Sequence, residues 1–488
     1  MLHIALLFFI GILLGLANLK STFLILTPLV TPSFLLLTFS SHQKISFSKR
    51  FIMGWVFGLG YFLVSLYWIP NALLVEANQF SWLVPFAFLG IPAICALLMG
   101  ASWIIIPWMH TQGVLRVGLF CLSWLLMECM LYLPFGGFPW SLIGYVWHRS
   151  LPMAQIAHPF TIHGLSLLTL IWGSFYYLLI EKRTKLARFS LISTLILSFL
   201  GCYLWGMKRL SEPNKIKDLP SLRMIQPNIP QKNKWHPAFQ KRNLRKILKL
   251  SYASGSDSQT LIIWPEAALT YNMTPSLLRY ITKYLNAEQF LITGVLETAP
   301  SFKDSFNVYN SLIVLNNRGH IIEKYRKHHR VPFGEYIPAS SLLNKIFPHS
   351  LRTIAGGRTQ TLRGKKPQTI QVSSDIQFSP QICFETLFGS LVSSKPEKPL
   401  WILNLTNDAW FGRSTGPYQH LQISRFRAIQ ANLPVVRAAS TGISAVIDNH
   451  GRIIKSLPYG QAGVIDVHKK DQIRRSGQEI WSSLTGRL

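Results

Sequence analysis

The chain has 488 residues, of which 49% are hydrophobic and only 14% are charged, which excludes an ordinary soluble protein. Up to about Met207, ten Lys and Arg stand against three acids, a net charge of +7, and the rest of the chain carries the other +22 of the total of +29. An apolar half therefore precedes a strongly basic, water-soluble half.

The charge of the second half favours an anionic partner, either nucleic acid or the head groups of acidic lipids. Nucleic acid is the less favoured of the two, because the sequence has no zinc-finger spacing, no basic heptad helix and no RNP-type strand. Attachment to a bilayer favours lipid. Lysines that merely solvate the surface are the alternative explanation.

Seven apolar runs in the first half are long enough to cross a hydrocarbon core as helices. They lie near residues 2–19, 21–40, 51–70, 82–107, 115–133, 161–180 and 189–207. The first lacks a basic n-region and an A-x-A cleavage site, so it is predicted to be a retained anchor. We therefore predict a transmembrane bundle of about seven helices over residues 1–207, followed by a linker over 208–219.

The loops between these runs predict the orientation, because Lys and Arg are retained on the cytoplasmic side. With the N-terminus inside, the inner loops hold eight Lys and Arg and the outer loops hold two. Seven crossings then place everything after Met207 outside the cytoplasm. The segment 134–160 would lie on the same outer side, where its aromatic residues form either an interfacial belt or a shaped loop that faces the soluble domain.

From about Leu219 the pattern changes to short β-rich runs separated by helical ones. Strands are predicted at Leu222–Ile229, Thr260–Trp264, Phe290–Leu296, Ser311–Asn316, Gly319–Tyr325, Thr369–Val372, Gln377–Phe384, Leu400–Leu405 and Ser444–Ile447, and helices at about 236–253, 275–287 and 415–432. This alternation predicts an α/β layered domain with a mixed sheet over 220–470, whose site lies at the carboxyl ends of central strands. The tail 471–488 is too short and polar to span a membrane.

Cys383 is the only cysteine of the polar half, which excludes an intrachain disulfide there and a zinc site made of thiolates. It is either a packed small hydrophobe or a nucleophile. In an extended strand residues 383 and 385 point to the same face, so Cys383 and Glu385 are predicted to share one side.

Two further charged residues could assist such a thiol. Glu266 directly follows a buried strand. Its carboxylate there either has a partner or takes part in catalysis. Alternatively, it is an acid at the N-terminus of a helix, stabilised by the helix dipole. Lys327 lies in a basic run, which is ordinarily a solvated face, but an apolar turn and Glu335 follow it. A Lys beside a Cys would lower the pKa of the thiol and stabilise an oxyanion.

These segments, in this order, resemble the Glu-Lys-Cys set of the nitrilase superfamily. They are Trp264-Pro265-Glu266, then Tyr325-Arg326-Lys327 with Pro332-Phe333-Gly334-Glu335, then Ile382-Cys383-Phe384-Glu385. With membrane helices before them, the chain is similar to the apolipoprotein N-acyltransferases, bacterial inner-membrane enzymes that add the third acyl chain to lipoproteins. Further matching segments are Gln226–Gln231 with Trp235, Tyr309–Ser311, Asn404–Gly412 and Arg437–Gly442.

The resemblance implies an α-β-β-α nitrilase-like sandwich after the helical bundle, and it implies a role for each matching residue. Cys383 would be the nucleophile, Glu266 the general base and Lys327 the residue that stabilises the oxyanion. Glu335 would hold Lys327 or the base in position, and Glu385 would support the nucleophile strand. Positions that line or shape the family's active site match Trp235, Asn310, Phe384, Trp410 and Phe411. Phe384 stands where the family often has Tyr, so that hydroxyl is absent.

The resemblance also implies the substrates and the location. A glycerophospholipid, typically phosphatidylethanolamine, would donate its acyl chain to Cys383 as a thioester, and the α-amine of an apolipoprotein's diacylglyceryl-cysteine would accept it, without metal or cofactor. The catalytic domain of a monomer would face the periplasm from the inner membrane. The family usually closes with a further transmembrane helix. The tail of this chain, residues 471–488, is too short and polar to form one, so we expect seven helices and a C-terminus outside the cytoplasm.

Two other functions are consistent with parts of the sequence. A nitrilase-type amidase acting on small polar amides would need one anchoring helix rather than seven. A transporter or scaffold with an inactive domain predicts functional charges inside the spans, where Glu128 is the main candidate.

Overall fold

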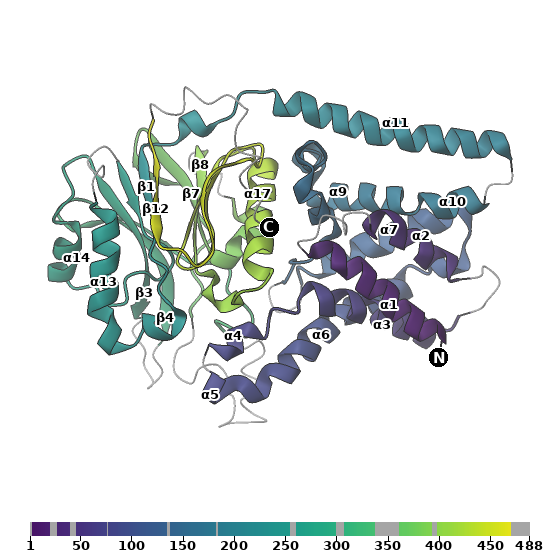
Figure 1. The fold of residues 1–488 in the computed structure, drawn as a ribbon, viewed down its shortest axis with the longest axis horizontal. Coiled ribbons are helices and arrows are strands. Elements are labelled where there is room, and N and C mark those ends of the chain that lie inside the picture. The colour runs from purple at the N-terminus through teal and green to yellow at the C-terminus, as the bar shows by residue number, and fades with distance from the viewer. Residues whose placement is uncertain are drawn as a thin grey trace. The chain divides into compact units, whose positions relative to one another are not determined.

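A computed structural model of the chain shows two compact units (Figure 1). The residues it describes are 2–19, 27–39, 45–75, 77–133, 137–181, 184–253, 260–298, 307–336, 361–392 and 398–469. The helical unit comprises Met1–Glu212 together with Arg413–Gln422. The second unit comprises Pro213–Gly412 together with Ile423–Leu488, and we call it the catalytic unit because the resemblance predicts that role. The predicted tail 471–488 lies outside the described residues.

The helical unit is built from apolar helices at each of the seven predicted positions. Its helices are α1 (Leu2–Gly15), α2 (Thr27–Leu37), α3 (Phe47–Ser65), α4 (Asn71–Leu74), α5 (Ala77–Phe80), α6 (Val84–Ile105), α7 (Gly113–Met130), α8 (Leu151–Ala154), α9 (Ala157–Gly173), α10 (Phe175–Glu181) and α11 (Lys185–Leu210). Small residues let two of them approach closely, because a Cβ on Gly11 of α1 would lie 2.1 Å from the carbonyl oxygen of Phe57 in α3.

Four helical stretches among the described residues are long and apolar enough to cross a membrane, namely Ser81–Ile105, Gly113–Met130, Ala157–Glu181 and Lys185–Leu210. The described part of α2 has 11 residues. At about 1.5 Å per residue it is shorter than a hydrocarbon core of about 30 Å. The structure thus describes a membrane-spanning bundle, and seven crossings stay a prediction.

Three aromatic residues of the segment 134–160, Trp140, Tyr145 and Trp147, are buried in the helical unit. Trp147 is 4% exposed, donates a hydrogen bond of 2.7 Å to Thr169 Oγ1 and packs edge-on against Trp172 and Phe199. The expectation of a belt is therefore wrong for this residue, because its indole N–H has a partner inside the bundle and not at the lipid surface.

Glu128 is fully buried in the helical unit and ties three elements together. Its carboxylate accepts hydrogen bonds from the Ile143 backbone N–H (2.9 Å), Ser166 Oγ (3.1 Å) and Trp124 Nε1 (3.2 Å), and His163 Nδ1 lies 3.1 Å away. Such a carboxylate is satisfied by the fold. It gives no support to a transport function.

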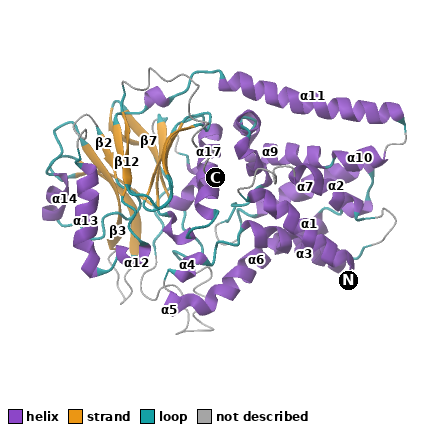
Figure 2. Ribbon diagram, viewed as in Figure 1, coloured by secondary structure: helices purple, strands orange, loops and turns teal. Residues whose placement is uncertain are grey.

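Two mixed six-stranded sheets form the catalytic unit (Figure 2). The first has the order β12-β1-β2-β3-β4-β5, and the second has the order β11-β10-β9-β8-β7-β6. The strands are β1 (Leu222–Gln226), β2 (Leu261–Ile263), β3 (Phe290–Thr298), β4 (Val308–Leu315), β5 (Ile321–Arg326), β6 (Ile370–Ser373), β7 (Ile376–Ile382), β8 (Trp401–Thr406), β9 (Val435–Ala439), β10 (Ser444–Ile447), β11 (Ile453–Leu457) and β12 (Gly463–Val467).

Alternating side chains explain the layers, because neighbouring residues of a strand point to opposite faces of a sheet. Met224 of β1 joins one buried cluster with Phe378 and Val436 of the second sheet, so the two sheets pack face to face. The next residue, Ile225, points the other way into a cluster with α13 (Pro237–Ser251) and α14 (Pro275–Thr282). These helices cover the outer face of the first sheet (Figure 1).

Helix α17 (Gly416–Ala431) passes from one unit into the other. Its second half belongs to the catalytic unit and buries Phe426 and Ile429. The side chain of Arg427 donates to the carbonyls of Thr386 and Leu387, just after the second sheet's strand β7. The α-β-β-α sandwich expected from the resemblance is therefore confirmed.

The predicted strands and helices of this unit are present, with ends displaced by a few residues, but three strands were not predicted. Strand β9 contains the buried Arg437, whose charge interrupts an otherwise apolar run. Strand β11 is half-buried along its whole length, and β12 is a short edge strand next to β1. None of the three shows the alternation or the continuous apolar run that indicates a strand.

Candidate active site

Three strand ends carry the residues that the sequence singles out. Glu266 lies in the turn after β2, Lys327 directly follows β5, and Cys383 directly follows β7. The first two strands belong to one sheet and the third belongs to the facing sheet. No helix begins at Glu266. The alternative that it is a helix N-terminal acid is therefore wrong, and Glu266 lies at the carboxyl end of a strand, as predicted.

Lys327 is the centre of a buried network of charges. Its side chain is 1% exposed, and its ammonium nitrogen lies 2.8 Å from Glu335 Oε1 and 3.9 Å from Glu266 Oε1. Asn310 of β4 donates to both carboxylates, at 2.7 Å to Glu266 Oε1 and at 3.3 Å to Glu335 Oε1. The network thus holds the two acids and the ammonium at fixed positions with charge-assisted hydrogen bonds.

Burial and charge act in opposite directions on the ammonium. Burial by itself lowers the pKa of Lys327, but the carboxylates of Glu335 and Glu266 outweigh it, and the pKa is raised well above its ordinary value. Lys327 is therefore a permanent cation at neutral pH. A fixed positive charge of this kind can stabilise an anion that develops next to it.

The charges of Glu266 and Lys327 both act on the Cys383 thiol. The pKa of Cys383 is raised to about 12, first by burial and then by the charge of Glu266, while Lys327 and a hydrogen bond with the Thr406 side chain act in the opposite direction. The resting sulfur is therefore a protonated thiol. A base must remove the thiol proton when the sulfur attacks, and the carboxylate whose charge acts most strongly on this thiol is Glu266.

Glu385 does not share a strand face with Cys383, because the strand stops before the cysteine. Residues Cys383–Leu387 form a 3-10 helix, so the prediction based on an extended strand is wrong. Instead, the fully buried carboxylate of Glu385 accepts from Tyr325 Oη (2.6 Å) and from the backbone N–H groups of His328 (2.8 Å) and Ile382 (2.7 Å). It joins the chain after Lys327 to the chain before Cys383.

Strained backbone marks the site. Among the described residues six that are not glycine have positive φ, and three of them belong to this region: Ala267 after Glu266 (φ 45°), Phe333 before Glu335 (φ 61°), and Cys383 itself (φ 52°). Each such residue costs on the order of 1–3 kcal/mol, and such strain collects at functional sites. The surrounding hydrogen bonds must hold these turns in place.

The residues expected to line the site are spread between the core and the surface. Asn310 is inside the charge network, and Phe384 is buried with its ring edge-on to Phe388. Trp235 and Trp410 are 40% and 39% exposed, and Phe411 is half-buried. Exposed indoles of this kind are available to a large apolar ligand.

Sequence reasoning missed several residues that contact the site. The Asn404 amide donates to the Cys383 carbonyl (3.3 Å), and Asn404 Oδ1 accepts from Arg437 (2.7 Å), which also forms a fully buried ion pair of 2.6 Å with Asp408. Asn404, Asp408 and Arg437 stand in segments that match the family, but the match gave them no role. A buried ion pair between distant residues leaves no local pattern.

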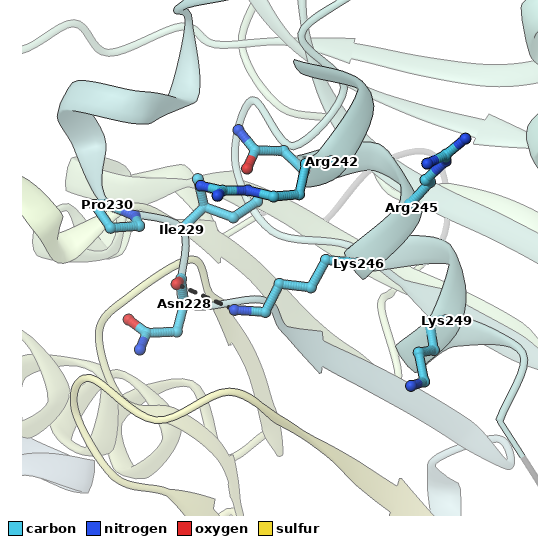
Figure 3. Close-up of a pocket in the computed structure, with 8 residues that line it drawn as sticks. Asn228, Ile229, Pro230, Arg242, Arg245, Lys246 and Lys249 are labelled. Carbon is cyan, nitrogen blue, oxygen red and sulfur yellow. Dashed lines mark hydrogen bonds between the residues drawn. The ribbon is translucent and has the colours of Figure 1, made fainter. Parts of the chain in front are cut away.

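A basic hollow of about 420 Å³ lies beside α13 (Figure 3). It is lined by Asn228, Ile229, Pro230, Arg242, Asn243, Arg245, Lys246 and Lys249. Burial, and then the neighbouring charge of Arg242, lower the pKa of Lys246, whose ammonium points to the Asn228 carbonyl oxygen at 3.5 Å. Part of the basic charge of this half is thus gathered along one helix, as expected for a face that attracts anions.

Two facing mixed sheets with helices on their outer faces are the architecture of the carbon-nitrogen hydrolase class. The profile of the carbon-nitrogen hydrolase family matches residues 222–475, and that of the apolipoprotein N-acyltransferase N-terminal domain matches residues 10–175. An amidase of known structure from a Nesterenkonia species aligns with 52% of this chain and 93% of its own, with a TM-score of 0.36 and 14% identity.

Curated relatives extend the likeness over most of the chain. The apolipoprotein N-acyltransferase of Rhodopseudomonas palustris is 35% identical over 425 residues, which is 85% of this chain and 79% of that protein. The apolipoprotein N-acyltransferase of Rickettsia typhi is 33% identical over 462 residues, which is 94% of this chain and 90% of that protein. The chain belongs to the apolipoprotein N-acyltransferase family.

Proposed function

We propose that this chain transfers a fatty acyl group from a membrane phospholipid to the N-terminal α-amine of a diacylated apolipoprotein, through a thioester on Cys383. One observation carries the proposal. The Glu266 carboxylate and the Lys327 ammonium lie 3.9 Å apart, and both charges act on one buried thiol at the ends of three strands. These are the three groups that acyl transfer through a thioester requires.

In the first half-reaction the thiol proton of Cys383 passes to Glu266, and the sulfur attacks the ester carbonyl of the phospholipid. Lys327 stabilises the oxyanion of the tetrahedral intermediate, with the backbone N–H of Phe384 as a further donor. The carbon–oxygen bond breaks, the leaving lysophospholipid oxygen takes the proton from Glu266, and the acyl chain stays on the sulfur. Phosphatidylethanolamine is the donor that we expect.

In the second half-reaction the α-amine of the acceptor's diacylglyceryl-cysteine attacks the thioester. Glu266 takes a proton from the amine, the carbon–sulfur bond breaks, and the proton returns to the Cys383 sulfur. No metal or cofactor takes part. Glu335 keeps Lys327 in place, Glu385 supports the turn that carries Cys383, and Trp235, Asn310, Phe384, Trp410 and Phe411 line or shape the place where the substrates bind.

Both substrates are anchored in a membrane, which gives the helical unit a purpose beyond attachment. A catalytic unit held at the lipid surface receives acyl chains that never enter water, and the reacting groups meet at high effective concentration. We propose that the protein acts as a monomer in the bacterial inner membrane with its catalytic unit on the periplasmic side.

The test is mass spectrometry of the purified full chain after exposure to phosphatidylethanolamine with a labelled acyl chain. We expect a hydroxylamine-sensitive acyl adduct on the peptide that contains Cys383, its loss in Cys383→Ala, and its retention in the control Cys129→Ala, which removes a thiol of the helical unit. An adduct that persists in Cys383→Ala would overturn the assignment. Hydrolysis of small amides without any acyl adduct would support an amidase.

Orientation has a separate test. A reporter fused after Leu488 should be active only outside the cytoplasm. A reporter active in the cytoplasm would overturn the periplasmic placement and leave the proposed chemistry untouched.

A further inference from the structure

Lys234 is a second buried lysine in the catalytic unit, and it stands at the end of α12 (Gln231–Lys234). Its side chain is 3% exposed, whereas Lys232 on the same short helix and Trp235 directly after it are both exposed. A long cationic side chain is rarely buried unless a partner compensates the loss of water. The partner shows what the lysine does.

The ammonium of Lys234 donates a hydrogen bond of 3.0 Å to the backbone carbonyl oxygen of Glu266. It therefore contacts the backbone of the residue that we propose as the general base, not its carboxylate. The turn it contacts is strained at Ala267 and is also fixed from β3, where a Cβ on Gly294 would lie 2.7 Å from the Glu266 Cα. Lys234 and Gly294 hold this turn through separate contacts.

The charge of Lys234 also acts on the reacting groups. The pKa of Lys234 is lowered to about 8, because burial lowers it by more than the attraction to Glu266 and to a Cys383 thiolate raises it. At neutral pH the side chain is thus mainly a cation. An ammonium has three N–H donors, and the Glu266 carbonyl accepts from one of them.

We propose that Lys234 is a positioning residue that fixes the turn carrying Glu266 and keeps a second positive charge beside the anion formed at Cys383. The proposal rests on the function proposed above. When the thiol proton passes to Glu266, the negative charge moves from the carboxylate to the sulfur. Lys234 attracts the negative charge both on the Glu266 carboxylate and on the Cys383 sulfur, so this charge keeps a cationic partner during the transfer. Lys327 remains bound to Glu335 throughout.

The experiment measures how fast iodoacetamide alkylates Cys383 between pH 6.5 and 10.5, read from the Cys383 peptide by mass spectrometry. Purified full-length protein is compared with Lys234→Met, which keeps the length but removes the charge, and with Lys234→Arg, which keeps the charge at every pH. Lys232→Met is the matched control, because Lys232 is an exposed lysine of the same helix.

For the unsubstituted protein we expect a rate that rises with pH, flattens between about pH 8 and about pH 9 as Lys234 loses its proton and with it the charge that favours the thiolate, and then rises again. Lys234→Met should react about 10-fold more slowly at pH 7.5, which corresponds to one pKa unit, and should rise with no break near pH 8. Lys234→Arg should keep the fast rate at pH 7.5 and continue to rise. The control should follow the unsubstituted protein.

A profile of Lys234→Met that keeps the break near pH 8, or a rate that equals that of the unsubstituted protein at pH 7.5, would overturn the proposal. A uniformly lower rate with the break retained would show a structural role alone. Thermal unfolding of each variant reports loss of fold separately. The assay needs no lipid, so failure of the acyl-adduct experiment above would refute the acyltransferase mechanism without deciding the role of Lys234.

Discussion

The ion pair of Lys327 and Glu335 gives the sharpest quantitative test of the site. Its atoms lie 2.8 Å apart, and the lysine is 1% exposed. At an effective dielectric constant of about 20, two unit charges at that distance attract by about 6 kcal/mol. Desolvation offsets much of this, and removing one partner of a buried pair typically costs about 3–5 kcal/mol because the other charge is left behind.

The perturbation is a double-mutant cycle of Lys327→Met and Glu335→Gln. Lys327→Met leaves two carboxylates, Glu335 and Glu266, facing each other without the ammonium, so it should destabilise most. Glu335→Gln leaves Lys327 with Glu266 at 3.9 Å and should cost less. The loss of unfolding free energy in the double variant should be smaller than the sum of the losses in the two single variants by about 3 kcal/mol. The reason is that neither member of the Lys327–Glu335 pair is then left without the other.

The assay is thermal unfolding of the purified chain in detergent, followed by tryptophan fluorescence at pH 7.5. For a domain of about 250 residues, 1 kcal/mol shifts Tm by about 2–4 °C, so the coupling should appear as about 6–12 °C. Glu288→Gln, at an exposed position of the same unit, is the control and should leave Tm nearly unchanged. Strict additivity of the two single shifts would refute the geometry of the network.

Three further outcomes follow from other contacts. Gly294→Ala should lower the rate of acyl-adduct formation at least 10-fold, because its Cβ would lie 2.4 Å from the Ala267 backbone nitrogen, whereas Gly90→Ala, with open space, should not change that rate. Asp408→Asn should cost about 3–5 kcal/mol in unfolding free energy, because it breaks a fully buried pair. The folded-state pKa of Lys234, about 8, lies below the ordinary value of 10.5. The unfolded chain therefore binds more protons between these two pH values. The free energy of unfolding, relative to that of Lys234→Met, should rise by about 3 kcal/mol from pH 8 to pH 10.5 and fall again as the pH is lowered.

The position of Glu266 could be predicted because this residue follows a strand with a clear pattern. Leu261–Ile263 is a continuous apolar run, and Trp264-Pro265-Glu266 ends it with a turn residue and a charge. The rule for strand carboxyl ends then gives the place of Glu266 without further information. What the sequence reasoning could not give was the backbone conformation after the strand.

Cys383 shows that limit. An extended strand through Glu385 was the natural extrapolation from Gln377–Phe384, yet the chain turns at Cys383 with φ 52°. The turn is held by Glu385, whose carboxylate binds backbone groups near residue 328 that lie 57 positions earlier in the sequence. A left-handed residue that is not glycine depends on such distant contacts, and local patterns contain no sign of them.

Lys234 shows the same limit for charge. In the sequence it stands between Lys232 and Trp235 in a basic stretch, where the ordinary expectation is a solvated side chain. Only the packing of α12 decides that one lysine of the pair is exposed and the other is buried against the Glu266 turn. Burial of a single polar residue on a four-residue helix has no period from which it could be predicted.

The strained turns explain why the charges around the site are buried rather than exposed. Backbone strain at Ala267 and at Cys383 costs on the order of 1–3 kcal/mol each, and a hydrogen bond to a charged group stabilises by about 1.5–3 kcal/mol. Lys234 binds the first turn by one such bond, and Glu385 binds the second by its contact with Ile382. Exposed charged groups would stabilise the turns much less, because water competes for their hydrogen bonds. These two hydrogen bonds therefore offset part of the strain at the turns that carry the proposed base and the thiol, while the burial of Lys234 has a desolvation cost that lowers its pKa.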